Sequence, residues 1–138
     1  MKLKDDFFRI TDSRPTAAGG LGSAAGEAAG LATAADHTVE LNPEHMIYRA
    51  HFPGNPITPG VCIIHIVKEL SEGMLGHRLL LKAVNNIKFL SVIDPLKDRQ
   101  VTFSVTISPE EAGAHKVGAV VHNGTGQFAK LSMSFINR

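Results

Sequence analysis

Alternating apolar and polar residues predict strands in the second half of the chain. Residues 101–107 and 129–135 alternate strictly, and a shorter apolar run covers residues 117–121. The alternating apolar members are Val101, Phe103, Val105, Ile107, Ala129, Leu131, Met133 and Phe135. This period of two is typical of strands with one buried face. Asn123-Gly124 favours a tight turn, and a second turn is expected over residues 108–113, so these strands should form an antiparallel meander. Ile87, Phe89 and Ile93 indicate a further strand that stops at Asp94-Pro95.

The segment before these strands has the pattern of a helix. Residues 61–74 are apolar except for a narrow polar stripe of His65, Lys68, Glu69 and Glu72, spaced i, i+3, i+4 and i+7. A helix that is apolar around most of its circumference is a core helix wrapped by other elements. One buried helix combined with an antiparallel sheet predicts an α+β layer architecture.

Small residues dominate residues 16–35, where 14 of 20 are Ala or Gly. Such a stretch is typical either of a flexible linker or of a hairpin with its turn at Gly19-Gly20 and Gly22. Alternation over residues 31–41, ending at Asn42-Pro43, predicts a strand and favours the hairpin.

Composition narrows the class of protein. The chain has 138 residues, 43% of them hydrophobic, which suits one domain over residues 1–138. A formal charge of +1 excludes a strongly basic nucleic-acid binder, and one cysteine excludes an internal disulfide. The uncharged residues 50–67 contain three prolines and so predict no membrane span, and Asp5-Asp6 interrupts any signal peptide. We therefore expect a soluble, cytoplasmic protein.

Residues 51–61, HFPGNPITPGV, carry the candidate chemistry. Three prolines and two glycines make a stiff turn that places His51 just before the predicted helix. The open backbone N–H groups at Gly60 and Val61 could hold a developing oxyanion. From the residues alone, His51 is either a catalytic base or a side chain that packs the loop.

This motif resembles the signature loop of the 3-hydroxyacyl-[acyl carrier protein] dehydratases, His-Phe-Pro-Gly followed by Pro-Gly at the head of a long helix. Residues 87–95, IKFLSVIDP, are similar to the same family's Lys/Arg-Phe strand and its Pro-containing turn. The resemblance implies a hot-dog fold, in which a curved antiparallel sheet wraps one central helix. It also implies a homodimer, or a higher oligomer, with an active site shared between protomers.

The reaction implied is loss of water from a (3R)-3-hydroxyacyl thioester to give a trans-2-enoyl thioester, on acyl carrier protein or coenzyme A. His51 would be the base, and the N–H of Gly60 would polarise the thioester carbonyl. The expected substrate-binding residues are Phe52, Pro53, Gly54, Ile57, Pro59, Val61 and Ile64, with an acyl tunnel lined in part by Phe52, Ile57, Ile63 and Ile64. The chemistry requires no cofactor and no metal.

The chain departs from the family at one catalytic position. The family has Glu or Asp five residues after the Pro-Gly glycine, and here that residue is His65. A neutral imidazole there could hydrogen-bond the substrate hydroxyl, with Glu69 fixing its tautomer. The simpler interpretation is that Lys68, Glu69 and Glu72 form the solvated face of the helix. Three functions stay open: a dehydratase with altered chemistry, a hot-dog thioesterase, or an acyl-binding protein that lost activity.

Other signals carry less weight. Cys62 lies among apolar neighbours and is expected to be a buried structural thiol. The seven histidines show no metal-ligand spacing, and residues 20–26 lack the glycine spacing of a nucleotide loop. The basic residues Lys82, Lys88, Lys97 and Arg99 are either a docking surface for an acidic carrier or ordinary solvated charges.

Overall fold

The computed structural model describes residues 2–16, 33–50 and 54–138. The elements in chain order are β1 (Phe8–Thr16), β2 (Thr33–Leu41), α2 (Met46–Ala50), α3 (Gly60–Leu75), β3 (Leu79–Phe89), β4 (Gln100–Pro109), a 3-10 turn η1 (Glu111–Gly113), β5 (His115–His122) and β6 (Gln127–Asn137). The predicted turn at Gly19-Gly20 and Gly22, and the predicted site residues His51, Phe52 and Pro53, lie outside the described residues.

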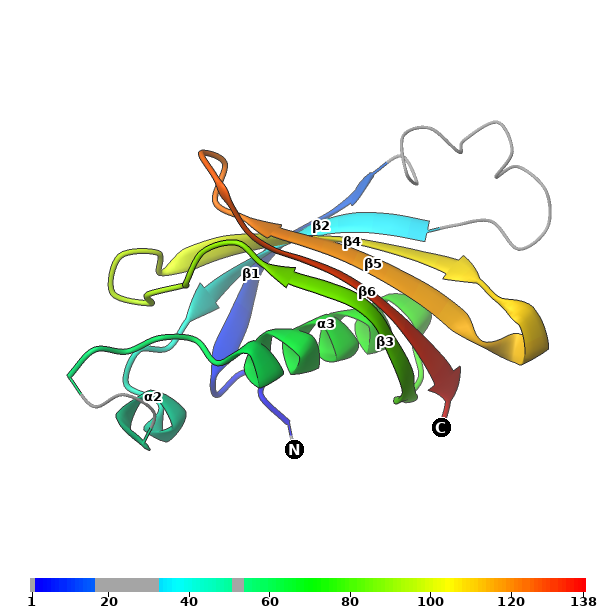
Figure 1. Cartoon of the computed structure of the whole chain (residues 1–138), viewed down its shortest axis with the longest axis horizontal. Helices are drawn as coiled ribbons and strands as arrows, with labels where there is room; N and C mark the ends of the chain where they lie inside the picture. The colour runs from blue at the N-terminus through cyan, green and yellow to red at the C-terminus, as the bar shows by residue number, and fades with distance from the viewer. Residues whose placement is uncertain (1, 17–32, 51–53) are drawn as a thin grey trace.

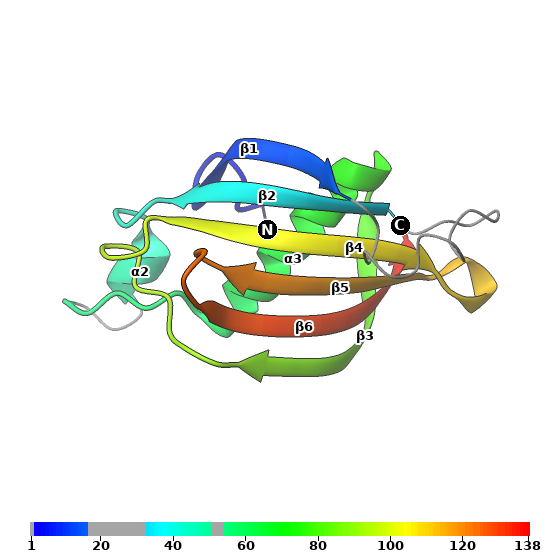
Figure 2. The same cartoon turned by 90° about the horizontal axis from the view of Figure 1, so that it is seen from above.

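Six strands form one antiparallel sheet in the order β1-β2-β4-β5-β6-β3, as Figure 2 shows from above. The predicted meander is confirmed for β4, β5 and β6. The β5–β6 turn forms where Asn123-Gly124 predicted it, because Oδ1 of Asn123 accepts hydrogen bonds from the N–H groups of Thr125 and Gly126. β1 and β2 pair as far as Thr16 with Ala34, as a hairpin connection requires.

The central helix α3 lies against the concave side of the curved sheet (Figure 1). Its bounds exceed the predicted residues 61–74 by one residue at each end. The helix ends at Gly76, whose positive φ of 79° lets its N–H bond the carbonyl of Glu72. The helix buries Cys62, Ile63, Ile66, Val67, Leu70 and Ser71. The sheet buries the alternating residues of β4 and β6 against it, so the α+β prediction is confirmed.

The sequence patterns did not predict the two outer strands correctly. β1 was not predicted, and the strand expected around residues 87–93 begins much earlier, at Leu79, and ends at Phe89. Ile93 is buried outside the strand, where its carbonyl accepts the N–H of Thr58 at 2.9 Å. Both strands lie at sheet edges and expose most of their side chains, so neither shows a clean period of two. β3 pairs with β6 and does not continue the meander into β4.

The polar stripe of α3 is not simply a solvated face. Glu69 has a side chain only 9% exposed, and its carboxylate accepts the backbone N–H groups of Leu3 and Lys4 at 2.7 and 2.9 Å. Glu72 accepts the N–H of Leu79 at 2.9 Å. The solvated-face interpretation is therefore wrong for both carboxylates, which fasten other segments to the helix. Lys68, half-buried, lies 3.8 Å from Glu72.

Candidate active site

The second half of the proline-rich motif leads directly into the N-terminus of α3. Pro59 is extended, with φ −64° and ψ 144°, and its carbonyl accepts the N–H groups of Cys62 and Ile63. The N–H groups of Gly60 and Val61 have no hydrogen-bond partner among the described residues. Open N–H groups at a helix N-terminus attract negative charge, so this end of α3 suits a developing oxyanion.

The strand motif meets the loop motif at Gly60. A Cβ atom added to Gly60 would come 2.7 Å from Cζ of Phe89, the last residue of β3. The two stretches that carried the family resemblance therefore touch at the start of the helix. The sequence pattern indicates Phe89 only as part of a strand, because nothing in the spacing reveals this contact.

His65 lies farther along α3 than Gly60 and Val61. Its side chain is 16% exposed, and Nε2 lies 3.0 Å from Oε2 of Glu69. The ring does not direct an N–H bond along that line, so Nε2 is buried without a hydrogen-bond partner among the described residues. Five residues advance the helix by about 7.5 Å, so His65 lies more than one turn beyond Gly60 and its open N–H.

The predicted substrate-binding residues that the structure describes surround the start of α3. Gly54 is exposed with φ 81°, whereas Ile57, Pro59 and Ile64 are half-buried. Val61 is 66% exposed, and Ile63 belongs to the buried core. The motif thus presents an apolar but incompletely covered surface at the helix N-terminus.

An exposed apolar strip continues this surface along β3. Leu81, Val84 and Ile87 pair with Phe135, Met133 and Leu131 of β6, which are buried on the concave side. Paired residues share a face of the sheet, so the β3 residues also face the concave side. Leu81 and Val84 are nevertheless 44% and 45% exposed, and Phe89 is 53% exposed. The strand that carries this strip, β3, is an edge strand of the sheet, as Figure 2 shows.

Comparison with protein families identifies this arrangement. Residues 29–125, well over half of the chain, match the family model described as ApeI-like, the ApeI dehydratase. The chain belongs to the ApeI-like dehydratase family. The match includes the whole proline-rich motif, α3 and β3 through β5.

Individual relatives of this ApeI-like chain are dehydratases by name. The 3-hydroxyacyl-[acyl-carrier-protein] dehydratase FabZ of Pediococcus pentosaceus is 34% identical over 73 residues, 48% of each chain. FabZ of Lactiplantibacillus plantarum is 32% identical over 79 residues, 44% of this chain and 54% of that relative. The ApeI-like chain thus spans about half the length of these relatives.

Solved structures confirm the fold of the ApeI-like chain. A chain of the dehydratase heterocomplex ApeI:P from Xenorhabdus doucetiae superposes with a TM-score of 0.61 at 16% identity, covering 94% of this chain and 97% of that one. An uncharacterized protein from Erwinia carotovora superposes with a TM-score of 0.57 at 16% identity, over 77% and 85% of the two chains. The predicted hot-dog fold, with its sheet curved around one helix, is therefore confirmed.

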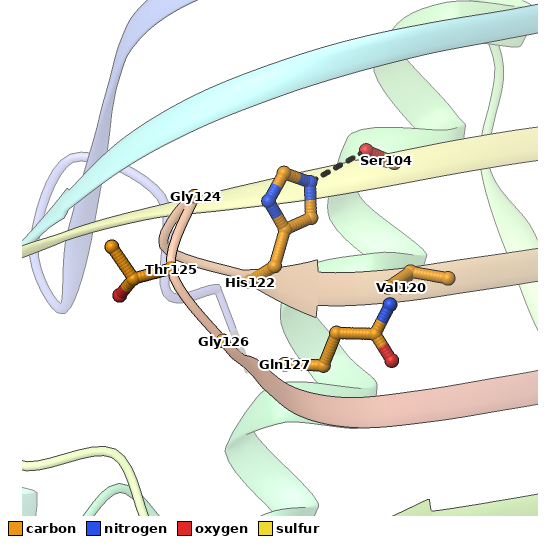
Figure 3. A pocket seen from close by; sticks show the side chains of 7 residues that line it. All are labelled: Ser104, Val120, His122, Gly124, Thr125, Gly126 and Gln127. Carbon is orange, nitrogen blue, oxygen red and sulfur yellow. Dashed lines mark hydrogen bonds between the residues drawn. The ribbon is translucent and has the colours of Figure 1, made fainter.

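Two surface grooves of the ApeI-like chain lie away from the motif. One, of about 430 Å³, lies at the β5–β6 turn, where Nε2 of His122 is 2.9 Å from Oγ of Ser104 (Figure 3). A serine nucleophile also needs a group that orients the histidine and N–H donors for the oxyanion. Among the described residues His122 bonds only Ser104, and Asn123 already occupies the N–H groups of the turn. This pair is therefore not an activated serine.

The second groove, of about 490 Å³, opens beside His65 and runs to the C-terminal end of α3. Its lining is mainly basic and includes Lys2, Lys4, Lys68, Arg78 and Arg138. Glu69 and Glu72 also line it, but both already accept backbone N–H groups.

Cys62 has the environment of a structural residue. Cys62 is buried, and burial raises the pKa of its thiol, which fits a structural role. Across residues 2–16, 33–50 and 54–138, no three His, Cys, Asp or Glu side chains gather into a group that could hold a metal ion. None of the described helices is long and apolar enough to cross a membrane.

Proposed function

We propose that this protein removes water from a (3R)-3-hydroxyacyl thioester and releases the trans-2-enoyl thioester. The unbroken motif of residues 51–61, in a chain of the ApeI-like dehydratase family, carries the proposal. The relatives named FabZ support a thioester on acyl carrier protein, with coenzyme A as the other carrier of the same chemistry. The proposed reaction uses no cofactor and no metal. We assign it to the cytoplasm.

The elimination breaks the C2–H and C3–O bonds of the substrate and forms the C2–C3 double bond. His51 takes the C2 proton, and the N–H of Gly60 stabilises the negative charge that grows on the thioester oxygen. His51 then returns the proton to the departing hydroxyl, so water leaves and the imidazole is regenerated. The open N–H at the first turn of α3 supports the second of these roles.

His65 holds the substrate hydroxyl in place of the family's carboxylate. Its Nε2 atom is buried without a hydrogen-bond partner among the described residues, so in this proposal the ring turns toward the adjacent groove to bind the hydroxyl oxygen. Because the family resemblance implies a site shared between protomers, the proposal takes His65 from a second copy. A homodimer, or a higher oligomer built from it, supplies that arrangement.

The exposed strip on β3 supports both the dimer and the acyl tunnel. Leu81, Val84 and Phe89 form an apolar surface next to an unpaired sheet edge, which a second copy would cover. The acyl chain would then run beside α3, along Phe52, Pro53, Ile57, Val61, Ile63 and Ile64. The ApeI:P structure is a heterocomplex. A heterodimer with a different partner chain is therefore another outcome of the test.

The carrier would approach over the basic side chains of the same region. Lys82 and Lys88 are exposed on β3, and Lys97 is exposed on the loop that follows. Arg99 lies 3.8 Å from Glu40, which partly neutralises it. We therefore expect the three lysines to contribute more than Arg99 to docking an acidic carrier.

The test offers the purified protein a 3-hydroxyacyl thioester and, in reverse, the enoyl thioester. We expect turnover in the wild type, loss of at least a hundredfold in His51→Ala, and wild-type rates in the surface control His77→Ala. A gain of turnover in His65→Glu would show that the scaffold lacked only the acid. Acyl-thioester binding without turnover would instead indicate a binding protein, and thiol release from a saturated acyl thioester would indicate a thioesterase.

A further inference from the structure

A buried hydroxyl just before the His51 motif meets a buried hydroxyl within the motif. Oη of Tyr48 lies 2.8 Å from Oγ1 of Thr58, and one of the two hydroxyls donates to the other. Tyr48 is 2% exposed and Thr58 is 5% exposed. Tyr48 precedes His51 by three residues, and Thr58 precedes Gly60 by two.

Each partner is fixed to a separate part of the fold. The ring of Tyr48 stacks on Phe7, with centroids 4.8 Å apart and an interplanar angle of 18°. Phe7 immediately precedes β1 and is fully buried in the hydrophobic core. The N–H of Thr58 donates to the carbonyl of Ile93 at 2.9 Å, on the segment after β3. The hydrogen bond between the hydroxyls is therefore a link between two anchored segments.

The chemistry of the pair suits a permanent link. Burial raises the pKa of Tyr48 well above its usual range, so its hydroxyl stays neutral and keeps its proton. Among the described residues each hydroxyl has the other as its side-chain partner, so losing either one removes the hydrogen bond that the other makes.

We infer that Tyr48 and Thr58 are positioning residues, which hold the segment leading into His51 against the segment leading into Gly60. The inference rests on the proposed function, since that function makes His51 the base and Gly60 the oxyanion donor. The chain that carries His51 leaves from Tyr48, and the chain that carries Gly60 begins at Thr58. A reaction that needs both groups at one substrate is sensitive to displacements of about 1 Å, which can lower the rate about a hundredfold.

A positioning role can be distinguished from a role in stability alone. Replacing both partners by apolar groups of the same shape is nearly neutral for stability, because no polar group is left unpaired. If the hydrogen bond only stabilised the fold, the double variant would regain the wild-type rate. If it positions the motif, the double variant stays slow although its stability returns.

The experiment compares Tyr48→Phe, Thr58→Val and the double variant with Thr58→Ser, which keeps the hydroxyl. We expect kcat to fall about tenfold or more in both single variants and in the double variant. KM should change less than threefold, and Thr58→Ser should recover most of the rate. Thr38→Val is the matched control, because its hydroxyl meets Thr102 at 3.4 Å on the sheet and lies outside the site.

The outcomes separate this inference from the proposed function. An active wild type that loses turnover in His51→Ala but not in Tyr48→Phe overturns the positioning role alone. A double variant that recovers both stability and kcat overturns it as well, and so does a Thr58→Ser variant as slow as Thr58→Val. A wild type without dehydratase turnover removes both the proposed function and the positioning role that depends on it.

Discussion

The ring of Phe89 lies so close to Gly60 that a Cβ atom at Gly60 would approach Cζ of Phe89 to 2.7 Å. Phe89 ends the edge strand β3, and Gly60 begins the central helix. The absence of a side chain at position 60 therefore lets strand and helix meet where the oxyanion would form.

Gly60→Ala is expected to lower kcat about tenfold or more, because Phe89 must move away from the helix N-terminus. Steady-state kinetics of the dehydration will measure this loss. The double variant Gly60→Ala/Phe89→Leu should recover part of the rate, since the shorter side chain makes room for the new methyl group.

Gly73→Ala is the matched control on the same helix. A Cβ atom there meets nothing within 4 Å, and alanine in a helix is more stable than glycine by roughly 0.5–1 kcal/mol. Full activity in Gly60→Ala, or no recovery in the double variant, would contradict the steric explanation.

Glu69→Gln is expected to destabilise the fold by about 1–3 kcal/mol. The carboxylate accepts the N–H groups of Leu3 and Lys4, and an amide offers only one acceptor oxygen for these two donors. Urea unfolding followed by circular dichroism will measure the loss, and hydrogen exchange should quicken at Leu3 and Lys4. The control is Glu111→Gln on the exposed 3-10 turn, and equal stabilities of the two variants would disprove the role of Glu69.

His37 should make the stability depend on pH. It is 6% exposed on β2, its Nδ1 is 2.8 Å from Oγ of Ser13, and Nε2 has no partner among the described residues. Burial lowers the pKa of His37 below 6.5, opposed by the nearby charge of Asp36. Below pH 6.5 the unfolded chain therefore takes up a proton that the folded chain does not.

The free energy of unfolding should accordingly be highest above pH 6.5 and fall as the pH drops toward the lowered pKa, by at most about 1.4 kcal/mol per pH unit from this group. Urea titrations at pH 7.5 and 5.5 measure the difference. His37→Gln should show a smaller decrease than the wild type, whereas Ser13→Ala, which keeps the imidazole, should retain it. An unchanged decrease in His37→Gln would show that other groups cause it.

The fold could be predicted where burial imposes a regular pattern. β4 and β6 have one buried face, and α3 has a broad one, so period and composition gave their type and nearly their bounds. β1 and β3 are edge strands whose exposed side chains follow no such pattern. The sheet order also depends on pairing between distant strands, which local periodicity does not contain.

The candidate site also has a part that the sequence predicts and a part that it does not. The motif located Gly60 and the helix N-terminus, because its prolines and glycines act on the local backbone. Phe89, Tyr48 and Thr58 act through contacts between segments, and no spacing along the chain predicts such contacts. Glu69 looked like a solvated charge because the N-terminal segment that covers it lies far away in sequence.

Val84→Lys is expected to convert a dimer into monomers. The side chain is 45% exposed within an apolar strip on the concave side of β3, so a charge there would be buried by a second copy without a partner. Size-exclusion chromatography with light scattering will give the mass of each variant. Because the proposed site takes His65 from the second copy, the monomer should also lose turnover, and its rate should rise again with protein concentration.

Thr16→Lys adds the same charge to the exposed end of the opposite edge strand and should leave both mass and rate unchanged. A wild type that is monomeric and fully active would contradict the shared site, and a mass explained only by a different partner chain would replace the homodimer with a heterodimer.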